Sequence, residues 1–270
     1  MSIDWNQAAA AWDRHRATIE DMKTEVTERL LASIGPLHGR RILELGGGTG
    51  ELAARLAEAA GASGSLLATD AAPAMVELLE KRLASYPSVE VGTVDVMAVD
   101  LPVGSFDVVV FRMGLMMAPD PDVALAGVRR VLRAGGTFAT AVWAAPHENP
   151  WMTAVGMAAA MNGLVSGGPP VGPGGPFSLA DPADLERRVR AAGFEEVTVE
   201  VVRKHRHYRD AAQQVEEIGT LSPQLAGAFD QATPEQMALV VESVAALTAQ
   251  HAAEGGGADV PATSLLCVAR

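Results

Sequence analysis

Four glycines follow a short apolar run near the start of the chain, in a pattern that could bind a ligand. The run covers residues 42–45 and includes Glu44, and the glycines are Gly46, Gly47, Gly48 and Gly50. An apolar strand that ends in glycines and continues into the helical pattern of residues 51–57 is typical of a strand–loop–helix unit. Because glycine has no Cβ, such a loop turns sharply and approaches a ligand closely. The unpaired N–H groups of the following helix complete the predicted binding site.

A second acidic residue stands at the end of the next apolar stretch. Residues 65–69 form this stretch, and Asp70 ends it. A carboxylate at this distance from a glycine turn can accept hydrogen bonds from both ribose hydroxyls of a nucleoside. The dinucleotide pattern G-x-G-x-x-G is not met, because Glu51 occupies the place of its third glycine. The residues therefore predict a nucleoside ligand, and a NAD-dependent oxidoreductase is the alternative that lacks its full motif.

A third acidic residue extends this prediction to the base of the nucleoside. Asp95 follows a strand predicted over residues 89–94. Its carboxylate could accept a hydrogen bond from the exocyclic amine of adenine, while the N–H of Val96 could meet a ring nitrogen.

Strand and helix signals alternate along this part of the chain. Further strands are predicted over residues 106–111 and 137–143, and helices over residues 73–84 and 120–132. Asp120 and Pro121 supply the N-cap and the first residue of the second helix. This alternation predicts an α/β fold with a doubly wound, mostly parallel sheet.

The spacing Glu44-x-Gly46-x-Gly48-x-Gly50 resembles the first motif of the class I S-adenosylmethionine-dependent methyltransferases. Residues 95–151 resemble, in register, the ubiquinone/menaquinone-biosynthesis-like (methyltransferase type 11) group of that class. The residues that carry this resemblance are Leu101-Pro102, Ser105-Phe106-Asp107, Pro119-Asp120-Pro121 and 128–136. The resemblance implies a seven-stranded Rossmann-like sheet, S-adenosyl-L-methionine as cofactor and S-adenosyl-L-homocysteine as product.

The resemblance also implies which residues bind the cofactor. Trp12-Asp13-Arg14 resembles the N-terminal motif of the family, in which aromatic and basic side chains approach the methionine end of the cofactor. The alternative is that Trp5 and Trp12 anchor the N-terminal helix on the core. The predicted cofactor-binding residues are Trp12, Arg14, Glu44, Gly46, Gly47, Gly48, Gly50, Asp70, Ala71, Met75, Asp95, Val96, Arg112 and Met113.

Methionines gather after the fourth and fifth predicted strands, at the carboxyl ends where such sheets bind ligands. Flexible thioethers suit an irregular apolar pocket, and ordinary helix packing is the alternative. The predicted substrate-pocket residues are Met116, Met117, Trp143, Trp151 and Val155. They favour a mostly apolar small-molecule acceptor: a quinone precursor, a polyketide-like aromatic, a terpenoid or an indole.

A general base is needed only for some acceptors, such as a phenol, a hydroxyl or an activated carbon acid. His147 follows the fifth strand and is the first candidate, ahead of His15 and His207. A solvent-exposed or hydrogen-bonded histidine is the alternative for each of them. The methyl group would go to an oxygen, nitrogen or carbon atom. A non-methylating reaction such as cyclisation is a second enzymatic hypothesis, and a non-catalytic binding module is the least favoured.

The chain divides into four predicted segments. Residues 1–34 form a helical cap, and residues 35–145 form the cofactor-binding core. Residues 146–180 supply a helix beside the acceptor pocket and a Gly/Pro-rich lid, for which an irregular connector is the alternative. Residues 181–270 complete the core, with strands over residues 196–203 and 264–269. A helical insertion over residues 210–254 separates these two strands and offers a cap or a homodimer surface.

Composition narrows the function classes. Lys and Arg number 21 against 33 Asp and Glu, and the net charge of −12 disfavours nucleic acid as a partner. The basic stretch over residues 203–207 is interpreted as a solvated face at a strand end. The single Cys267 excludes an internal disulfide and fits a buried strand, which favours a reducing, cytoplasmic compartment.

Membrane and metal binding find no support in the sequence. The N-terminal residues lack a signal-peptide pattern, and no apolar run reaches the roughly 18 residues of a membrane span. His205-x-His207 is a pair without an evident third ligand, so no metal site is predicted.

Overall fold

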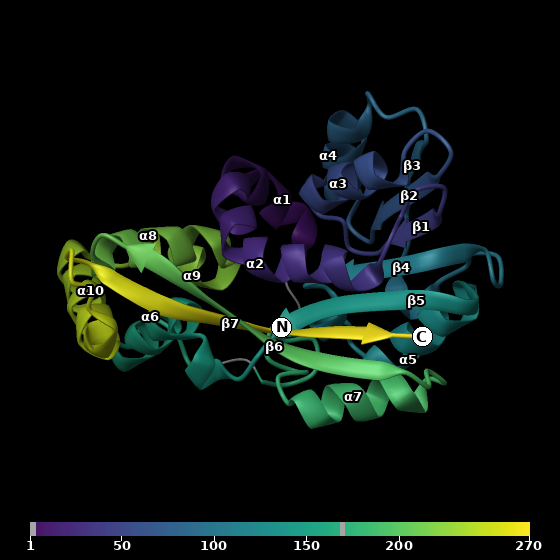
Figure 1. Ribbon diagram of the computed structural model, residues 1–270. Helices are drawn as coiled ribbons and strands as arrows, with labels where there is room; N and C mark the ends of the chain where they lie inside the picture. Colours follow the sequence, from purple (N-terminus) through teal and green to yellow (C-terminus); the bar gives the residue numbers. More distant parts are fainter. Residues whose placement is uncertain (1–3, 168–170) are drawn as a thin grey trace.

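A single twisted sheet organises the chain in the computed structural model, which describes residues 4–167 and 171–270 (Figure 1). Its seven strands lie in the order β3-β2-β1-β4-β5-β7-β6, and β7 is antiparallel to both of its neighbours. The strands are β1 (Arg41–Glu44), β2 (Ser65–Asp70), β3 (Val89–Thr93), β4 (Phe106–Arg112), β5 (Leu132–Trp143), β6 (Val197–Tyr208) and β7 (Ala258–Ala269). The prediction of a seven-stranded, mostly parallel sheet is confirmed.

Helices cover both faces of the sheet, which explains why its central strands are apolar throughout. The helices α2, α3 and α4 share one hydrophobic cluster on one face, and α5 and α7 belong to the cluster on the other. The helices of these two layers are α2 (Arg16–Ile34), α3 (Glu51–Ala60), α4 (Pro73–Leu83), α5 (Pro121–Val131) and α7 (Pro182–Ala191). Among the described residues, no helix is long and apolar enough to cross a membrane.

The remaining helices lie around the carboxyl ends of the strands and beyond them. The N-terminal helix α1 contacts α4 and α8, while α6, α8 and α10 pack together at the far end of the β6–β7 pair (Figure 1). These helices are α1 (Trp5–Arg14), α6 (Pro150–Met161), α8 (Ala211–Leu221), α9 (Pro223–Phe229) and α10 (Pro234–Thr248). Short 3₁₀ turns are η1 (Val96–Ala98), η2 (Leu115–Met117), η3 (Pro146–Glu148) and η4 (Ala249–His251).

The helix starts follow the local signals of the sequence. Asp120 accepts hydrogen bonds from the first turn of α5, with Pro121 at the first helical position. Thr233 and Gln236 form a capping box at the start of α10. The prediction for Asp120 and Pro121 is confirmed.

The two C-terminal strands are longer than predicted. β6 reaches Tyr208 instead of residue 203, and β7 begins at Ala258 instead of residue 264. They pair along their whole length, with His205 opposite Pro261. Pro261 is tolerated because β5 pairs only from Ser264 onward, so this part of β7 needs no N–H on that side. The polar side chains in this stretch interrupt the pattern of apolar residues from which the strands were predicted.

Residues 203–207 lie inside β6 and not at a strand end, so this part of the prediction is wrong. Arg203, His205 and His207 are exposed, as a solvated face requires, whereas Lys204 and Arg206 are half-buried and face α2 and α8. Lys204 and Arg206 bind Asp21 of α2, and Arg206 also binds Glu217 of α8 at 2.9 Å. These ion pairs attach the helical insertion and α2 to the outer strand of the sheet.

The boundary between α5 and β5 also differs from the prediction. The strand begins at Leu132, directly after α5, and not at residue 137. Leu132 pairs with Phe106, and the register shifts before Thr137 pairs with Val108. Gly135, at a φ of 68°, lies within this irregular part of the strand.

The Gly/Pro-rich stretch 163–176 has no helix or strand in its described parts, and its residues 168–170 lie outside the described residues. Its end is anchored on the core. Phe177 is buried, and the Ser178 hydroxyl donates to the carbonyl of Met116 at 2.6 Å.

Candidate functional site

The glycine turn, residues 45–50, lies between the end of β1 and the start of α3. Gly46 and Gly48 have φ angles of 62° and 57°, a conformation that favours glycine. A Cβ on Gly46 would meet the Phe111 ring at 2.9 Å, whereas a Cβ on Gly48 would meet no atom within 4 Å. The turn is therefore closed toward the core at Gly46 and open at Gly48, as a ligand cradle requires.

Asp70 holds this turn in place from the end of β2. Its two carboxylate oxygens accept hydrogen bonds from the N–H groups of Gly48 and Ala72, both at 3.0 Å. Burial raises the pKa of Asp70, and these backbone donors oppose the shift. Each oxygen keeps a further acceptor position, so the side chain can still accept from ribose hydroxyls.

The other residues predicted for the nucleoside lie at the ends of β2 and β3. Asp95 caps η1 by accepting from the N–H of Met97 at 2.9 Å, and it remains exposed. Val96 is half-buried beside it, and Ala71 is exposed just after Asp70. Met75 is instead buried in a small cluster with Ala9 of α1, so it links α1 to α4.

Glu44 is a buried acid directly beneath the glycine turn. Its side chain is only 2% exposed, and its Oε2 atom has no hydrogen-bond partner among the described residues. A Cβ on Gly47 would lie 3.2 Å from this oxygen, so the carboxyl group touches the turn. An unpartnered buried oxygen is costly and marks a place where a donor is missing.

The cations near Glu44 are occupied by another acid. Arg112, at the end of β4, donates from Nη1 and Nη2 to the two oxygens of Glu20 at 2.7 and 2.9 Å. Its Nη1 also donates to the Thr27 hydroxyl at 2.7 Å. Lys23 binds Glu20 at 2.6 Å. Glu20, Lys23, Glu44 and Arg112 therefore form a partly buried charge cluster in which Glu20 pairs with both cations.

The charges of this cluster shift the pKa values of its acids in opposite directions. Burial raises the pKa of Glu44 to about 8, although Arg112 and Lys23 oppose the shift. Burial alone would also raise the pKa of Glu20, but Lys23 and Arg112 lower it to about 2. Glu20 is therefore the ionised partner of both cations, and Glu44 holds its proton at neutral pH.

The N-terminal helix covers this region, but through residues other than Arg14. Trp12 is half-buried, packs edge-on against Trp5 and donates from Nε1 to the carbonyl of Leu221 at 3.4 Å. Arg14 is exposed. Arg16 and Arg82 reach both Asp13 and Glu51, which joins α1 and α4 to the end of the glycine turn.

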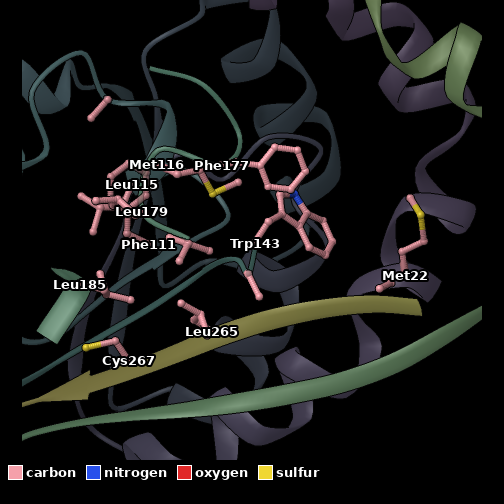
Figure 2. Close-up of a cluster of buried hydrophobic side chains, with 14 of the residues drawn as sticks. Met22, Phe111, Leu115, Met116, Trp143, Phe177, Leu179, Leu185, Leu265 and Cys267 are labelled. Carbon is pink, nitrogen blue, oxygen red and sulfur yellow. The ribbon is translucent and has the colours of Figure 1, made fainter. Parts of the chain in front are cut away.

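The predicted acceptor residues gather in one apolar cluster past the ends of β4 and β5. Met116, Trp143, Trp151 and Val155 are buried there, and Met117 is half-buried at its edge. The rings of Trp143 and Trp151 lie 5.1 Å apart. Figure 2 shows Phe177 and Met116 beside Trp143, with Met22 of α2 on the other side of the indole.

Met113 occupies the corner between this apolar cluster and the end of β4. Its φ of 60° is the one positive value among the described residues other than glycine. Residues of this kind cost free energy and concentrate at functional sites. Its N–H donates to the carbonyl of Ala141 at 2.8 Å, which fixes the turn.

His147 lies in η3, after the end of β5, and is exposed. It lines a shallow pocket of about 260 Å³ together with Glu148, Arg203, Lys204, His205, Pro261 and Thr263. None of the residues predicted to bind the cofactor lines this pocket. Of the two further candidates, His15 lies between α1 and α2, and His207 binds Asp259 at 2.8 Å. In the part of the chain that the structure describes, no three His, Cys, Asp or Glu side chains are placed to hold a metal ion.

A buried asparagine fixes the segment that carries His147. The Asn149 amide nitrogen donates to the carbonyls of Ala144 and Thr263, and its Oδ1 accepts from the Thr263 N–H and from Trp151 Nε1. These bonds tie the start of α6 to both β5 and β7.

Sequence reasoning missed the part of the site that α2 contributes. Glu20, Lys23 and Thr27 each follow a residue of the buried apolar stripe of this helix, Ile19, Met22 and Val26. Polar residues beside such a stripe are usually solvated, so their position carried no distinguishing signal. Phe177 was also missed, because it directly follows a Gly/Pro-rich stretch without a helix or strand pattern.

Comparison with known proteins identifies a domain and relatives. Residues 42–136 match the family described as a methyltransferase domain. The chain is 31% identical over 124 residues to a ubiquinone/menaquinone biosynthesis C-methyltransferase of Pseudoalteromonas translucida, which covers 44% of this chain and 49% of that protein. It is 32% identical over 109 residues to the demethylmenaquinone methyltransferase of Staphylococcus aureus, which covers 40% and 45%. The chain thus spans about half the length of the curated relatives it matches.

Solved structures show the same fold over nearly the whole chain. The YcgJ protein of Bacillus subtilis superimposes with a TM-score of 0.61 at 15% identity, over 90% of this chain and 96% of that one. The [4+2]-cyclase SpnF superimposes with a TM-score of 0.58 at 18% identity, over 100% and 97%. At these identities the likeness concerns the fold alone.

The raised pKa of Glu44 predicts a specific pH dependence of stability. Between its unfolded value of 4.5 and its folded value of about 8, the folded protein holds the extra proton, so the free energy of unfolding falls as pH rises. Glu44→Gln removes this titration. Without ligand, the variant should gain stability relative to the unmodified protein from pH 5 to pH 8, by at most about 1.4 kcal/mol per pH unit. Urea unfolding at a series of pH values measures the difference, and a constant difference contradicts the assignment.

Proposed function

We propose that the chain is a class I S-adenosylmethionine-dependent methyltransferase and that it methylates a mostly apolar small molecule. The observation that carries the proposal is the glycine turn. It is open at Gly48 and flanked by two carboxyl groups, the half-buried Asp70 and the buried Glu44. Membership of the family implies S-adenosylmethionine as the cofactor, and these groups match its hydroxyl and ammonium donors.

We assign each part of the cofactor to residues at or after the end of a different strand. Asp70 would hold the ribose hydroxyls, and Asp95 with the Val96 N–H would hold adenine. Glu44 and the glycine turn would hold the methionine end. The half-buried Asp70 and the buried Glu44 also suit a ligand with a cationic sulfur, since ionised acids nearby stabilise positive charge.

When bound, S-adenosylmethionine supplies an activated methyl group for in-line displacement. The chain must then hold the acceptor on the line of attack. Correct placement of two reactants can supply about 7–11 kcal/mol of the barrier. The helix α1 packs on α4, and the start of α2 reaches the end of β4 through Glu20, so these two segments would help to exclude water from the reacting groups.

The apolar cluster past β4 and β5 supports the choice of acceptor. Trp143, Met116 and Phe177 bring aromatic and thioether groups together there, and Met22 of α2 belongs to the same buried cluster. A flat apolar acceptor packs well against such groups, whereas a small charged acceptor would lose its hydration there. The names of two curated relatives refer to ubiquinone/menaquinone biosynthesis and to demethylmenaquinone. Quinone precursors belong to the class of mostly apolar small molecules proposed here.

His147 remains the candidate base for acceptors that must lose a proton. It is exposed and lies four residues after Trp143, the last residue of β5.

Cyclisation remains the second candidate function, because a [4+2]-cyclase shares the fold over nearly the whole of both chains. The two reactions differ in their products. Methyl transfer forms one S-adenosylhomocysteine for each product, and cyclisation forms none.

Replacement of Asp70 tests the proposed cofactor site. Asp70→Ala removes the acceptors for the ribose hydroxyls and should weaken binding of S-adenosylmethionine by about one to two decades, or roughly 1–3 kcal/mol. Isothermal titration calorimetry gives the affinity, and thermal unfolding without ligand reports any loss of fold. Asp230→Ala, an exposed aspartate at the end of α9, is the matched control and should bind normally. Equal affinities for the two variants would refute the assignment.

A panel of acceptors tests the reaction and its substrate class together. The chain is incubated with S-adenosylmethionine and either quinol-like, phenolic, terpenoid and indole compounds or amino acids and small amines. We expect S-adenosylhomocysteine and a methylated product from the apolar group. A clear preference for the amino acids and small amines would contradict the proposal of an apolar acceptor. A converted acceptor without S-adenosylhomocysteine would favour cyclisation.

A further inference from the structure

The carboxyl group of Glu44 lacks a partner although two cations lie nearby. Arg112 donates from Nη1 and Nη2 to Glu20 and from Nη1 to Thr27, and Lys23 forms an ion pair with Glu20. Among the described residues no donor reaches Glu44 Oε2. The folded chain therefore leaves one acid of the cluster unsatisfied, on the side that touches the glycine turn.

The groups around Glu44 come from three elements. Glu20 and Lys23 face it from α2, Arg112 from the end of β4 and Asp70 from the end of β2. The acids Glu20 and Asp70 disfavour its ionisation, and the two cations favour it. Burial outweighs this balance, because a carboxylate that is removed from water without a hydrogen-bond donor is strongly destabilised.

We propose that Glu44 couples cofactor binding to the release of a proton: it is protonated in the free protein and ionises when the α-ammonium group of the cofactor reaches it. This inference rests on the proposed function and assigns a proton to its binding step. The ammonium group supplies the missing donor, directly or through one bridging water. The O–H bond of Glu44 breaks, the proton passes to solvent, and the carboxylate and the ammonium group form an ion pair.

The proposal distinguishes the parts of the cofactor. S-adenosylmethionine and S-adenosylhomocysteine both carry the ammonium group, so both should release the proton. 5′-Methylthioadenosine keeps the adenine, the ribose and a sulfur but has no amino-acid end. It should bind without proton release, and it controls for Asp70, because its ribose reaches that carboxylate in the same way.

Calorimetric titration at pH 7 in buffers of different ionisation enthalpy measures the protons released. We expect about one proton per bound S-adenosylmethionine or S-adenosylhomocysteine, and none with 5′-methylthioadenosine. The affinity for S-adenosylmethionine should also rise from pH 6 to pH 7, by up to about tenfold. Glu44→Gln, which keeps the shape of the side chain, should bind without proton release.

Each other outcome counts against the proposal. Binding of S-adenosylmethionine with a heat that does not depend on the buffer would overturn it while leaving the proposed function intact. Proton release with 5′-methylthioadenosine, or from Glu44→Gln, would assign the proton to another group. Failure of S-adenosylmethionine to bind at all would remove the proposed function itself, which is a different and recognisable result.

Discussion

The ion pair between Arg112 and Glu20 is the interaction on which the site depends. It joins the end of β4 to α2, with two parallel hydrogen bonds and a third to Thr27. A buried pair of this kind is costly to break, because a lone buried charge would remain. The bond therefore fixes the N-terminal part of α2 beside the end of β4. This position brings Met22 to the apolar cluster and leaves Glu44 without a cation of its own.

The two ends of the cofactor would meet different physical environments. Asp70 is bonded to the backbone on both oxygens and, in the proposed site, would serve as a fixed acceptor at the ribose. Glu44 has no such partner, so its charge depends on what binds beside it. The apolar cluster of Trp143, Met116 and Phe177 adds a third environment, to which the proposal assigns an acceptor with little charge. The parallel sheet makes this arrangement possible because the ends of β1, β2, β4 and β5 meet along one edge.

The sequence predicts the parts of the fold that rest on local signals. The glycine turn, the helix caps and the apolar strands each have a pattern of a few neighbouring residues, and the structure contains them. The lengths of β6 and β7 could not be read in this way, because their outer halves are polar and gain their strand conformation from pairing with each other. The true start of β5 depends on a register shift against β4 for the same reason.

The residues of the candidate site differ in the same way: some can be predicted from local signals in the sequence, and others cannot. Glu44, Asp70 and the glycines lie in one motif or directly after a strand, so their type and spacing suffice to find them. The roles of Glu20, Lys23 and Thr27 depend on the packing of α2 against the end of β4. Arg112 bonds to Glu20 and Thr27, which lie 92 and 85 positions before it in the chain. Arg112 was expected at the cofactor, and the structure commits Nη1 and Nη2 of its guanidinium to this helix. The burial of Met75 against α1 likewise depends on contacts between distant elements.

Calorimetric titration of the purified chain with S-adenosylmethionine, S-adenosylhomocysteine and NAD tests the central claim most directly. The account predicts binding of both sulfur nucleosides and no binding of NAD, because the glycine turn lacks the third glycine of a dinucleotide site and ends in Glu51. Binding of NAD without either sulfur nucleoside would contradict the account, and the roles of Asp70 and Glu44 would have to be assigned again.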